Sequence, residues 1–427
     1  MQIPDVPPQL LAALVEAAAG QRLALVGGVV RDLLLHRHHQ DPWRGLPDLD
    51  LVVEGRAADL VERLPAALEH HLGVPVPLRQ QHHGRYGTVE LELQLPPEHG
   101  GTWLLDVASA RQESYPKPGF NPVVSPGTLE QDLARRDFTV NAMALVLNPV
   151  GAEVGAELEL LDPFGGQVDL AERKLRFLHP NSLRDDPTRL VRAARYAARL
   201  EFRMASGALH QAKTTLQEWP WLWTFGDPPE QAPPGLAGRL RRELERLLNQ
   251  AQSQVALRIL MQNSGFGLFV PQQEAINMST YCFHWAQRLG ITRSMAFVRL
   301  TSSPVELAIR LRFSHRDIIS LRQSISLDYA VKSTQLQLPS EWTALIESIT
   351  SSADAVSLSI IGGCCSRHPL LSWMVRWRHV RSLITAQELL MRGWVPGPSL
   401  GNELRTQRLK NIDHLYRQPR IDSAPSM

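Results

Sequence analysis

The sequence predicts a mixed α/β head followed by a mostly α-helical body and tail. Up to about residue 170, short apolar runs typical of buried strands alternate with stretches of helical periodicity. Beyond that point the strand signals thin out, and long amphipathic stretches rich in helix-forming residues take over. The length of 427 residues also exceeds what one ordinary core requires, so two or more domains are expected.

The head is predicted to contain four strands and several helices. A helix over residues 9–19 precedes the strand and glycine pair of RLALVGG, and helical spacing resumes in VVRDLLL. The runs DLDLVVEG, GTVELEL and WLLDVAS predict three further strands. Helices are expected over ADLVERLPAAL, with its proline as an irregularity, and over LEQDLARRDFTVNAMAL, which shows helical periodicity.

The second half of the chain is predicted to be helical. TRLVRAARYAARLEF and LAGRLRRELERLLNQAQSQVALRILM are amphipathic, and the loop WPWLWTFGDPPEQAPPG between them predicts a domain boundary. We therefore expect three parts: a catalytic head over residues 1–150, a neck over 151–225, and a helical body and tail over 226–427.

Composition sets limits on the class of protein. Lysine and arginine number 45 against 43 acidic residues, and this net charge of +2 neither requires nor excludes nucleic acid. The three cysteines, Cys282, Cys364 and Cys365, form neither a disulfide framework nor a CxxC zinc pair. The N-terminus lacks the pattern of a secretory signal, and no apolar run has the length of a membrane span. A cytoplasmic protein without membrane contact is expected.

Two aspartates in LPDLDLVVEG carry the first chemical signal. Asp48 and Asp50 are two residues apart, a spacing that points both side chains to one face of a strand. Adjacent carboxylates repel each other unless a cation lies between them, and Mg²⁺ prefers such oxygen ligands together with substrate phosphates. Asp106, in WLLDVAS, is available as a third ligand. Taken alone, the pair is also compatible with solvated acids or a helix-capping loop.

The glycine pair of LVGGVVRD lies between a strand and a helix. Gly27 and Gly28 would let the backbone approach a ligand, and the N-terminus of the following helix favours an anion. Arg31, one turn into that helix, would reach a triphosphate. The pattern is neither GxxxxGK nor GxGxxG, and on its own it also fits a plain strand-to-helix turn.

In combination and in order, these strings resemble a known family. GGVVRDLLL and DLDLVVEG, then RYGTVEL, LLDVASARQESYPKPG, DLARRDFTVNAMAL, DPFGGQVDL and LRDDPTRLVRAARYAARLEF resemble the motifs of the class II tRNA nucleotidyltransferase (CCA-adding) and bacterial poly(A) polymerase family, within the DNA polymerase beta superfamily. The resemblance spans residues 22–203. It is looser from residue 236 onward, in LAGRLRRELERLL, GFGLFVP and GWVPGPSLGNEL.

The resemblance implies a nucleotidyltransferase head and a role for each matching residue. Asp48 and Asp50 would bind the catalytic metals, with Asp106 as a third ligand. The triphosphate, ribose and remaining phosphates would be held by Gly27, Gly28, Arg31, Arg135, Arg136, Asp137 and Asn141. In a helix, Asp137 and Asn141 would share one face, although an ordinary surface ion pair is the alternative.

The last motif has a helical spacing of its own. Asp186, Arg189, Arg192 and Arg195 recur every three residues and form a polar stripe. A fixed aspartate and arginine offer an acceptor and donors, as a base pair does, and the resemblance implies that Asp186 and Arg189 read CTP and ATP. Arg192 and Arg195 would bind substrate phosphate or support the pair. The alternative is a solvated face of an amphipathic helix.

Some features depart from the family or point elsewhere. Asp185 stands where many members have glutamate, and the loop over residues 36–47 is longer than usual. The vicinal histidines of the head, among them His70 and His71, are expected to be surface residues rather than a metal cluster. Trp373 and Trp377, interleaved with arginines, fit a buried stripe better than an RNA contact.

These expectations define one reaction and its rivals. The favoured function is template-independent addition of C and A to the 3′ end of tRNA, from CTP and ATP with Mg²⁺, without an obligate protein partner. A poly(A) polymerase or an enzyme that adds only CC or only A remains open. So do two rivals of another kind, a catalytically inactive RNA-binding protein and an adaptor that binds nucleotide without turnover.

Overall fold

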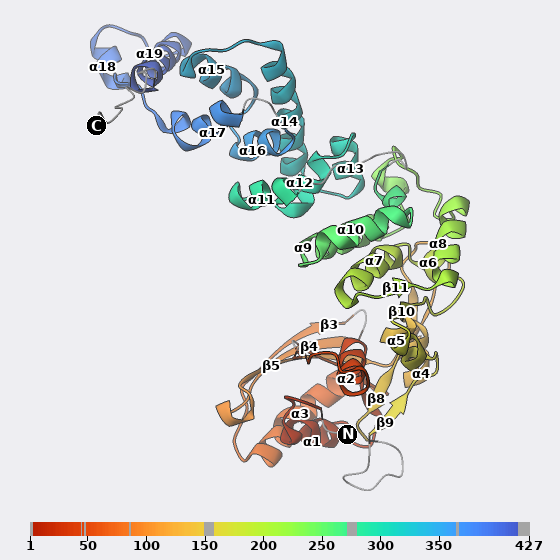
Figure 1. Cartoon of the computed structure of the whole chain (residues 1–427). Helices are drawn as coiled ribbons and strands as arrows, with labels where there is room; N and C mark the ends of the chain where they lie inside the picture. The colour runs from red at the N-terminus through yellow and green to blue at the C-terminus, as the bar shows by residue number, and fades with distance from the viewer. Residues whose placement is uncertain are drawn as a thin grey trace, which may run out of the picture. The chain divides into compact units, whose positions relative to one another are not determined.

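The computed structural model describes residues 3–43, 45–46, 48–84, 87–148, 158–270, 280–363 and 367–416. The adjacent cysteines at 364 and 365 lie outside these ranges. The described chain divides into two compact units: residues 1–223, 231–243 and 250–268 form the first, and 224–230, 244–249 and 269–427 form the second. The predicted fold class, a mixed α/β head followed by helices, is confirmed (Figure 1).

The first unit contains a seven-stranded mixed sheet in the order β3-β4-β5-β2-β1-β8-β9. Its strands are β1 Leu23–Val26, β2 Leu49–Val53, β3 Leu78–His83, β4 Thr88–Gln94, β5 Thr102–Ser109, β8 Ala144–Val146 and β9 Glu159–Leu161. Central strand β2 is parallel to β5 and antiparallel to β1. All of β1 and most of β2 is buried, which is why both strands consist mainly of apolar residues in the sequence.

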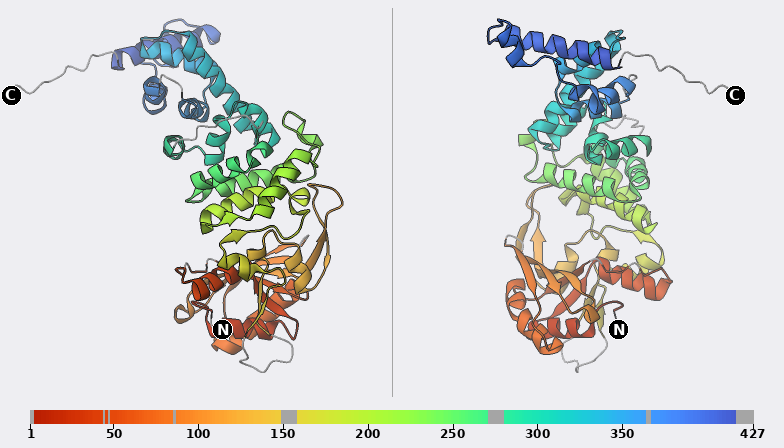
Figure 2. Two further views of the ribbon diagram at one scale, coloured as in Figure 1. Left: turned by 45° about the vertical axis from the view of Figure 1, so that its right-hand side comes forward. Right: turned by 90° about the vertical axis from the view of Figure 1, so that its left-hand side faces the viewer.

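Helices and small two-stranded sheets surround this sheet. The helices are α1 Pro8–Ala17, α2 Gly28–His39, α3 Ala57–Leu72, α4 Leu129–Ala134 and α5 Gly166–Ala171. The small sheets pair β6 Arg111–Ser114 with β7 Val123–Pro126, and β10 Lys174–Leu175 with β11 Arg203–Met204. Helices α1 and α3 lie side by side, and α3 also contacts β4 and β5 (Figures 1 and 2). Pro65 is accommodated inside α3, as predicted.

Two local predictions for the head were wrong. Helix α2 continues to His39, so the first residues of the predicted loop over 36–47 are helical. The segment LEQDLARRDFTVNAMAL is not one helix, because α4 ends at Ala134 and only a 3₁₀ turn, Thr139–Asn141, follows. Phe138 between them is extended and bridges Phe177 in the manner of a strand. This tertiary pairing overrides the helical periodicity.

The first unit continues with helices that follow the sheet. They are α6 Ser182–Asp185, α7 Thr188–Leu200, α8 Ser206–Glu218, α9 Leu236–Asn249 and α10 Ser253–Gln262, with the last six residues of α9 assigned to the second unit. The amphipathic stretch predicted over 236–261 therefore forms two helices, α9 and α10. The three-part division at residues 150 and 225 stays a prediction.

Among the described residues, every regular element of the second unit is a helix. Its helices are α11 Thr280–Arg288, α12 Arg293–Arg299, α13 Pro304–Arg310, α14 His315–Ser333, α15 Pro339–Ile349, α16 Ala353–Ile361, α17 Arg367–Val375, α18 Ala386–Met391 and α19 Pro398–Tyr416. Trp373 and Trp377 are buried in its core with Ile346 and Ile412, which confirms the core interpretation of this aromatic pair. Arg408 forms a two-pronged ion pair with Glu347 beside them, with N–O distances of 2.7 and 2.8 Å.

Among the described residues, no single helix is both long and apolar enough to cross a membrane. Helices α15 and α16 meet that criterion only as a pair, by length and composition, and the chain bends by 106° between them.

Candidate active site

Three carboxylates converge at the centre of the sheet. Asp48 immediately precedes β2, Asp50 lies within β2, and Asp106 lies in the neighbouring parallel strand β5, where the register pairs it with Asp50. One oxygen from each of the three side chains lies within 4.8 Å of the other two. The two-residue spacing therefore places Asp48 and Asp50 close together, and the parallel pairing adds Asp106 to the same cluster.

The electrostatics of this cluster favour a bound cation. Burial, reinforced by the charge of Asp48, raises the pKa of Asp50 from its ordinary value to about 6. Burial and the charges of Glu90 and Asp48 also raise the pKa of Asp106. An all-oxygen donor set of this kind fits a hard divalent cation, whose charge would hold the carboxylates in their ionised form.

The glycine bend lies directly beside the carboxylates. Gly27, the residue before α2, has a φ of +71°, a conformation that favours glycine. A Cβ atom at this position would lie 3.1 Å from Nη1 of Arg136 and 3.5 Å from Oδ2 of Asp50. The bend, the carboxylate cluster and an arginine therefore meet at one point, an arrangement that would suit a triphosphate beside a cation.

Arg31 occupies an internal position rather than an open one. It is fully buried, and its guanidinium donates to both oxygens of Asp32, at 2.8 and 2.9 Å, and to Oδ1 of Asn141 at 2.7 Å. These contacts tie α2 to the 3₁₀ turn that carries Asn141. The contacts seen are those of a positioning residue, and the triphosphate contact expected of Arg31 stays a prediction.

Asp132, which the sequence analysis missed, holds both arginines of the ARRD segment. Its buried carboxylate accepts from Arg135 at 2.7 Å and from Arg136 at 3.1 Å. Glu113 of β6 forms a further ion pair with Arg135, at 3.3 Å. Asp132 lies three and four residues before the arginines, a helical spacing that could have revealed it.

Asp137 and Asn141 are neighbours although no helix connects them. Nδ2 of Asn141 donates to Oδ1 of Asp137 at 3.3 Å, and the other oxygen of Asp137 pairs with Arg192 at 2.7 Å. Burial alone would raise the pKa of Asp137, but Arg192 and Arg189 hold it below its ordinary value. The ordinary surface ion pair considered as an alternative is therefore wrong, because Asp137 is buried.

In the stripe of the last motif Arg189 is buried and the other three residues are half-buried. Arg189 is only 4% exposed, and it donates to the main-chain oxygens of Ser182 at 3.3 Å and Arg135 at 2.9 Å. Arg195 pairs with Glu243 of α9 at 3.5 Å. The alternative of a solvated helix face does not hold for Arg189, whose guanidinium is fixed by the protein.

A second missed residue, Arg239 of α9, lies beside Asp186. Its Nε is 3.6 Å from Oδ1 of Asp186, and its other nitrogens donate to Asn121 and to the carbonyl of Gly119 at 2.5 and 2.7 Å. The same Oδ1 of Asp186 accepts from the main chain and the hydroxyl of Thr188, at 3.2 and 2.9 Å. Asp186 is thus held at the start of α7 by its near neighbour Thr188 and by Arg239, which is remote in sequence.

Comparison with known proteins agrees with this geometry. Residues 23–176 match the family model of the poly(A) polymerase head domain. The chain is 37% identical over 331 residues to the CC-adding tRNA nucleotidyltransferase of Deinococcus radiodurans, covering 75% of each chain. It is 42% identical over 185 residues to the A-adding tRNA nucleotidyltransferase of Aquifex aeolicus, but this match covers 43% of the chain and only 19% of that relative.

A solved structure extends the likeness to the fold of the whole chain. The apo form II of a CCA-adding enzyme superposes with a TM-score of 0.68, at 24% sequence identity, over 97% of this chain and 96% of that one. The head match and the Deinococcus relative together lead to one conclusion. The chain belongs to the tRNA nucleotidyltransferase family, and its residues 23–176 form a poly(A) polymerase head domain.

Proposed function

We propose that the chain adds nucleotides to the 3′ end of tRNA without a nucleic-acid template. In this reaction the RNA 3′-hydroxyl attacks the α-phosphate of bound CTP or ATP, and pyrophosphate leaves. The observation that supports it most directly is the convergence of Asp48, Asp50 and Asp106 beside the Gly27 bend.

We also propose that the protein works in the cytoplasm, as the sequence predicts.

The carboxylates would hold Mg²⁺, the divalent ion that most often binds through carboxylates and substrate phosphates together. Bound there, Mg²⁺ would lower the pKa of the attacking hydroxyl and stabilise the charge that develops on the phosphate. Arg136 would neutralise the triphosphate, a role supported by its position next to Asp50 and the Gly27 bend. Asp132 fixes that arginine before substrate arrives, so the interaction costs little reorganisation.

Base selection would be carried out by Asp186 and Arg189. A carboxylate accepts from the exocyclic amine that cytosine and adenine share, whereas uracil and guanine present a carbonyl at that position. Arg189 would donate to ring acceptors of the base, and hydrogen bonds to two main-chain oxygens already fix the direction of its guanidinium.

Asp137, with Arg192 and Asn141, would bind the ribose. The helices beyond the head would hold tRNA by its shape and phosphates.

The test of this function is a product ladder. Labelled tRNA lacking its terminal nucleotides is incubated with CTP alone, with ATP alone and with both, and the products are separated at single-nucleotide resolution. We expect at most three additions that stop at CCA, CC or A, depending on the substrate end. A long adenosine tail would instead indicate a poly(A) polymerase. No extension and no pyrophosphate release would contradict the proposal and favour an RNA-binding protein or nucleotide adaptor.

The pKa of Asp50 predicts how cation binding depends on pH. Because this pKa is raised to about 6 in the folded protein, folding of the metal-free chain is favoured by protonated Asp50 at low pH. That contribution is lost as pH rises through about 6, where ionised Asp50 faces the charge of Asp48 and Arg136 offsets this repulsion only in part. Added Mg²⁺ should therefore raise the thermal midpoint clearly at pH 8 and hardly at pH 5.

The matched measurement is a thermal denaturation series from pH 5 to pH 8, with and without Mg²⁺. Asp50→Asn should flatten the pH dependence of the Mg²⁺ effect, since asparagine does not titrate. An equal Mg²⁺ effect at both ends of the range in the wild-type protein would contradict the raised pKa.

A further inference from the structure

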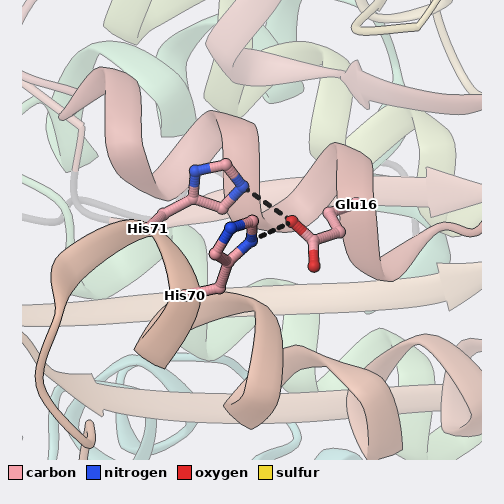
Figure 3. Close-up of side chains that lie close together, drawn as sticks. All are labelled: Glu16, His70 and His71. Atoms are coloured by element: carbon pink, nitrogen blue, oxygen red, sulfur yellow. Dashed lines mark hydrogen bonds and ion pairs between the residues drawn. The ribbon is translucent and has the colours of Figure 1, made fainter.

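A second group of metal-ligating side chains lies on the head, apart from the catalytic carboxylates. Glu16 belongs to the last turn of α1, and His70 and His71 belong to the last turn of α3. Figure 3 shows both imidazole rings directed at the same carboxylate oxygen. Oε2 of Glu16 lies 2.9 Å from Nδ1 of His70 and 2.9 Å from Nε2 of His71. The three ligand atoms lie within 4.8 Å of one another.

Consecutive residues on a helix point about 100° apart, so a vicinal pair rarely shares a target. Here the two histidines use different ring atoms: His70 presents its near nitrogen, Nδ1, and His71 its far nitrogen, Nε2. The target is held in place, because Nε of Arg63 on α3 donates to the carbonyl of Ala17 at 2.7 Å. The end of α1 is thereby fixed against α3 beside both imidazoles.

The local charge favours a cation. Both helices end at this point, and the free carbonyls at a helix C-terminus carry partial negative charge. Glu16 adds a full negative charge, and the hydrogen bond from His70 lowers the pKa of its carboxyl. One carboxylate and two helix ends therefore surround two nitrogens that can each donate a lone pair when the imidazoles are neutral.

The spacing also suits a transition metal. Ligand atoms about 2.0–2.1 Å from a tetrahedral Zn²⁺ lie about 3.3 Å apart. The two observed nitrogen–oxygen separations of 2.9 Å need to open by only a few tenths of an ångström to admit an ion. Exposed side chains such as His70 can make this adjustment without disturbing the core, and solvent supplies the remaining ligand.

We propose that Glu16, His70 and His71 form a binding site for Zn²⁺ or a similar imidazole-preferring divalent metal, which joins the end of α1 to the end of α3. Two nitrogens and one carboxylate distinguish this site from the all-oxygen catalytic cluster, which suits Mg²⁺. From the sequence alone, these histidines were expected to be ordinary surface residues rather than metal ligands. It is independent of the proposed catalytic function.

The test is calorimetric titration of the full-length protein with Zn²⁺ in excess Mg²⁺, which occupies the catalytic carboxylates. The wild-type protein should bind one equivalent of Zn²⁺, and the same binding should persist in Asp50→Asn. Glu16→Gln, His70→Ala and His71→Ala should each weaken it about tenfold or more, because even outer partners of a metal cost about 10–100-fold when lost. The absorption spectrum of bound Co²⁺ should report nitrogen ligands and lose that signature in the same variants.

The matched control is the double variant His38→Ala/His39→Ala. These vicinal histidines also end a helix, α2, but within the described residues they are not part of a three-ligand cluster. The control should bind Zn²⁺ as the wild-type protein does. Absence of Zn²⁺ binding in folded wild-type protein, or equal binding in the three ligand variants, would overturn the proposal and leave a pair of histidine–glutamate hydrogen bonds. Circular dichroism establishes that each variant is folded.

Discussion

Asp48→Ala should reduce nucleotide incorporation by about a thousandfold or more. The substitution removes one of the three carboxylates proposed to hold the cation and leaves Asp50 and Asp106 to hold it alone. A cation at a phosphoryl centre contributes several kcal/mol of transition-state stabilisation, and about 1.4 kcal/mol corresponds to a factor of ten in rate. The measurement is single-turnover extension of labelled tRNA with CTP or ATP. The effect should appear mainly in the rate of the chemical step rather than in nucleotide affinity.

A suitable control is Asp59→Ala, which removes a carboxylate of α3 whose described ion pair is with the exposed Arg56. It should extend tRNA at the wild-type rate. Asp48 is exposed, so its loss should leave the fold intact, which thermal denaturation in the absence of metal checks. Undiminished incorporation by Asp48→Ala would show that these carboxylates do not hold the catalytic metal.

Asp186→Asn should change which nucleotides are accepted. Asparagine keeps the size of the side chain, and its oxygen still accepts from Thr188, so α7 should begin at the same place. Its amide nitrogen, however, donates where the carboxylate accepted. The kcat/KM for CTP and ATP should fall about a hundredfold, the effect of losing one well-placed polar contact and leaving its partner unpaired. UTP and GTP, which carry a carbonyl in place of the amine, should gain relative to them.

The readout is incorporation of each of the four nucleotides under single-nucleotide conditions, with Asp185→Asn as the neighbouring control. The control should preserve the order of preference. An unchanged preference in Asp186→Asn would exclude this carboxylate as the reader of the base. Arg239→Met gives an independent check, because loss of the guanidinium beside Asp186 should weaken discrimination without changing any group proposed to touch the base.

Much of the fold followed from the sequence because buried strands leave a clear signature. The apolar runs at β1 and β2 predicted buried strands, and the structure places both in the middle of the sheet. By contrast, β3 (LRQQHH) is polar and mostly exposed, so its pairing at the sheet edge with β4 left no hydrophobic pattern to detect. The β6–β7 pair was missed because each strand has only four residues, all of them exposed or half-buried, so neither forms an apolar run.

The candidate site likewise has a part that local sequence patterns predict and a part that depends on residues far apart in the chain. Asp48 and Asp50 could be predicted because their relation is local, set by the two-residue period of a strand. Contacts such as Arg239 with Asn121 join residues far apart in the chain, and no local pattern reports them. The surroundings of Phe138 show the reverse error, in which local periodicity predicted a helix and a distant strand partner, Phe177, decided otherwise.

The alignment of β2 with β5 has a consequence for how this enzyme can change over evolutionary time. Asp50 and Asp106 face each other across two parallel strands, and their directions depend on the alternation of side chains along each strand. Deleting or inserting one residue within Leu49–Val53 would turn a carboxylate to the opposite side and remove the cluster. Length variation in related chains should therefore accumulate in connecting segments such as 40–47, whereas these two strands should vary by substitution alone.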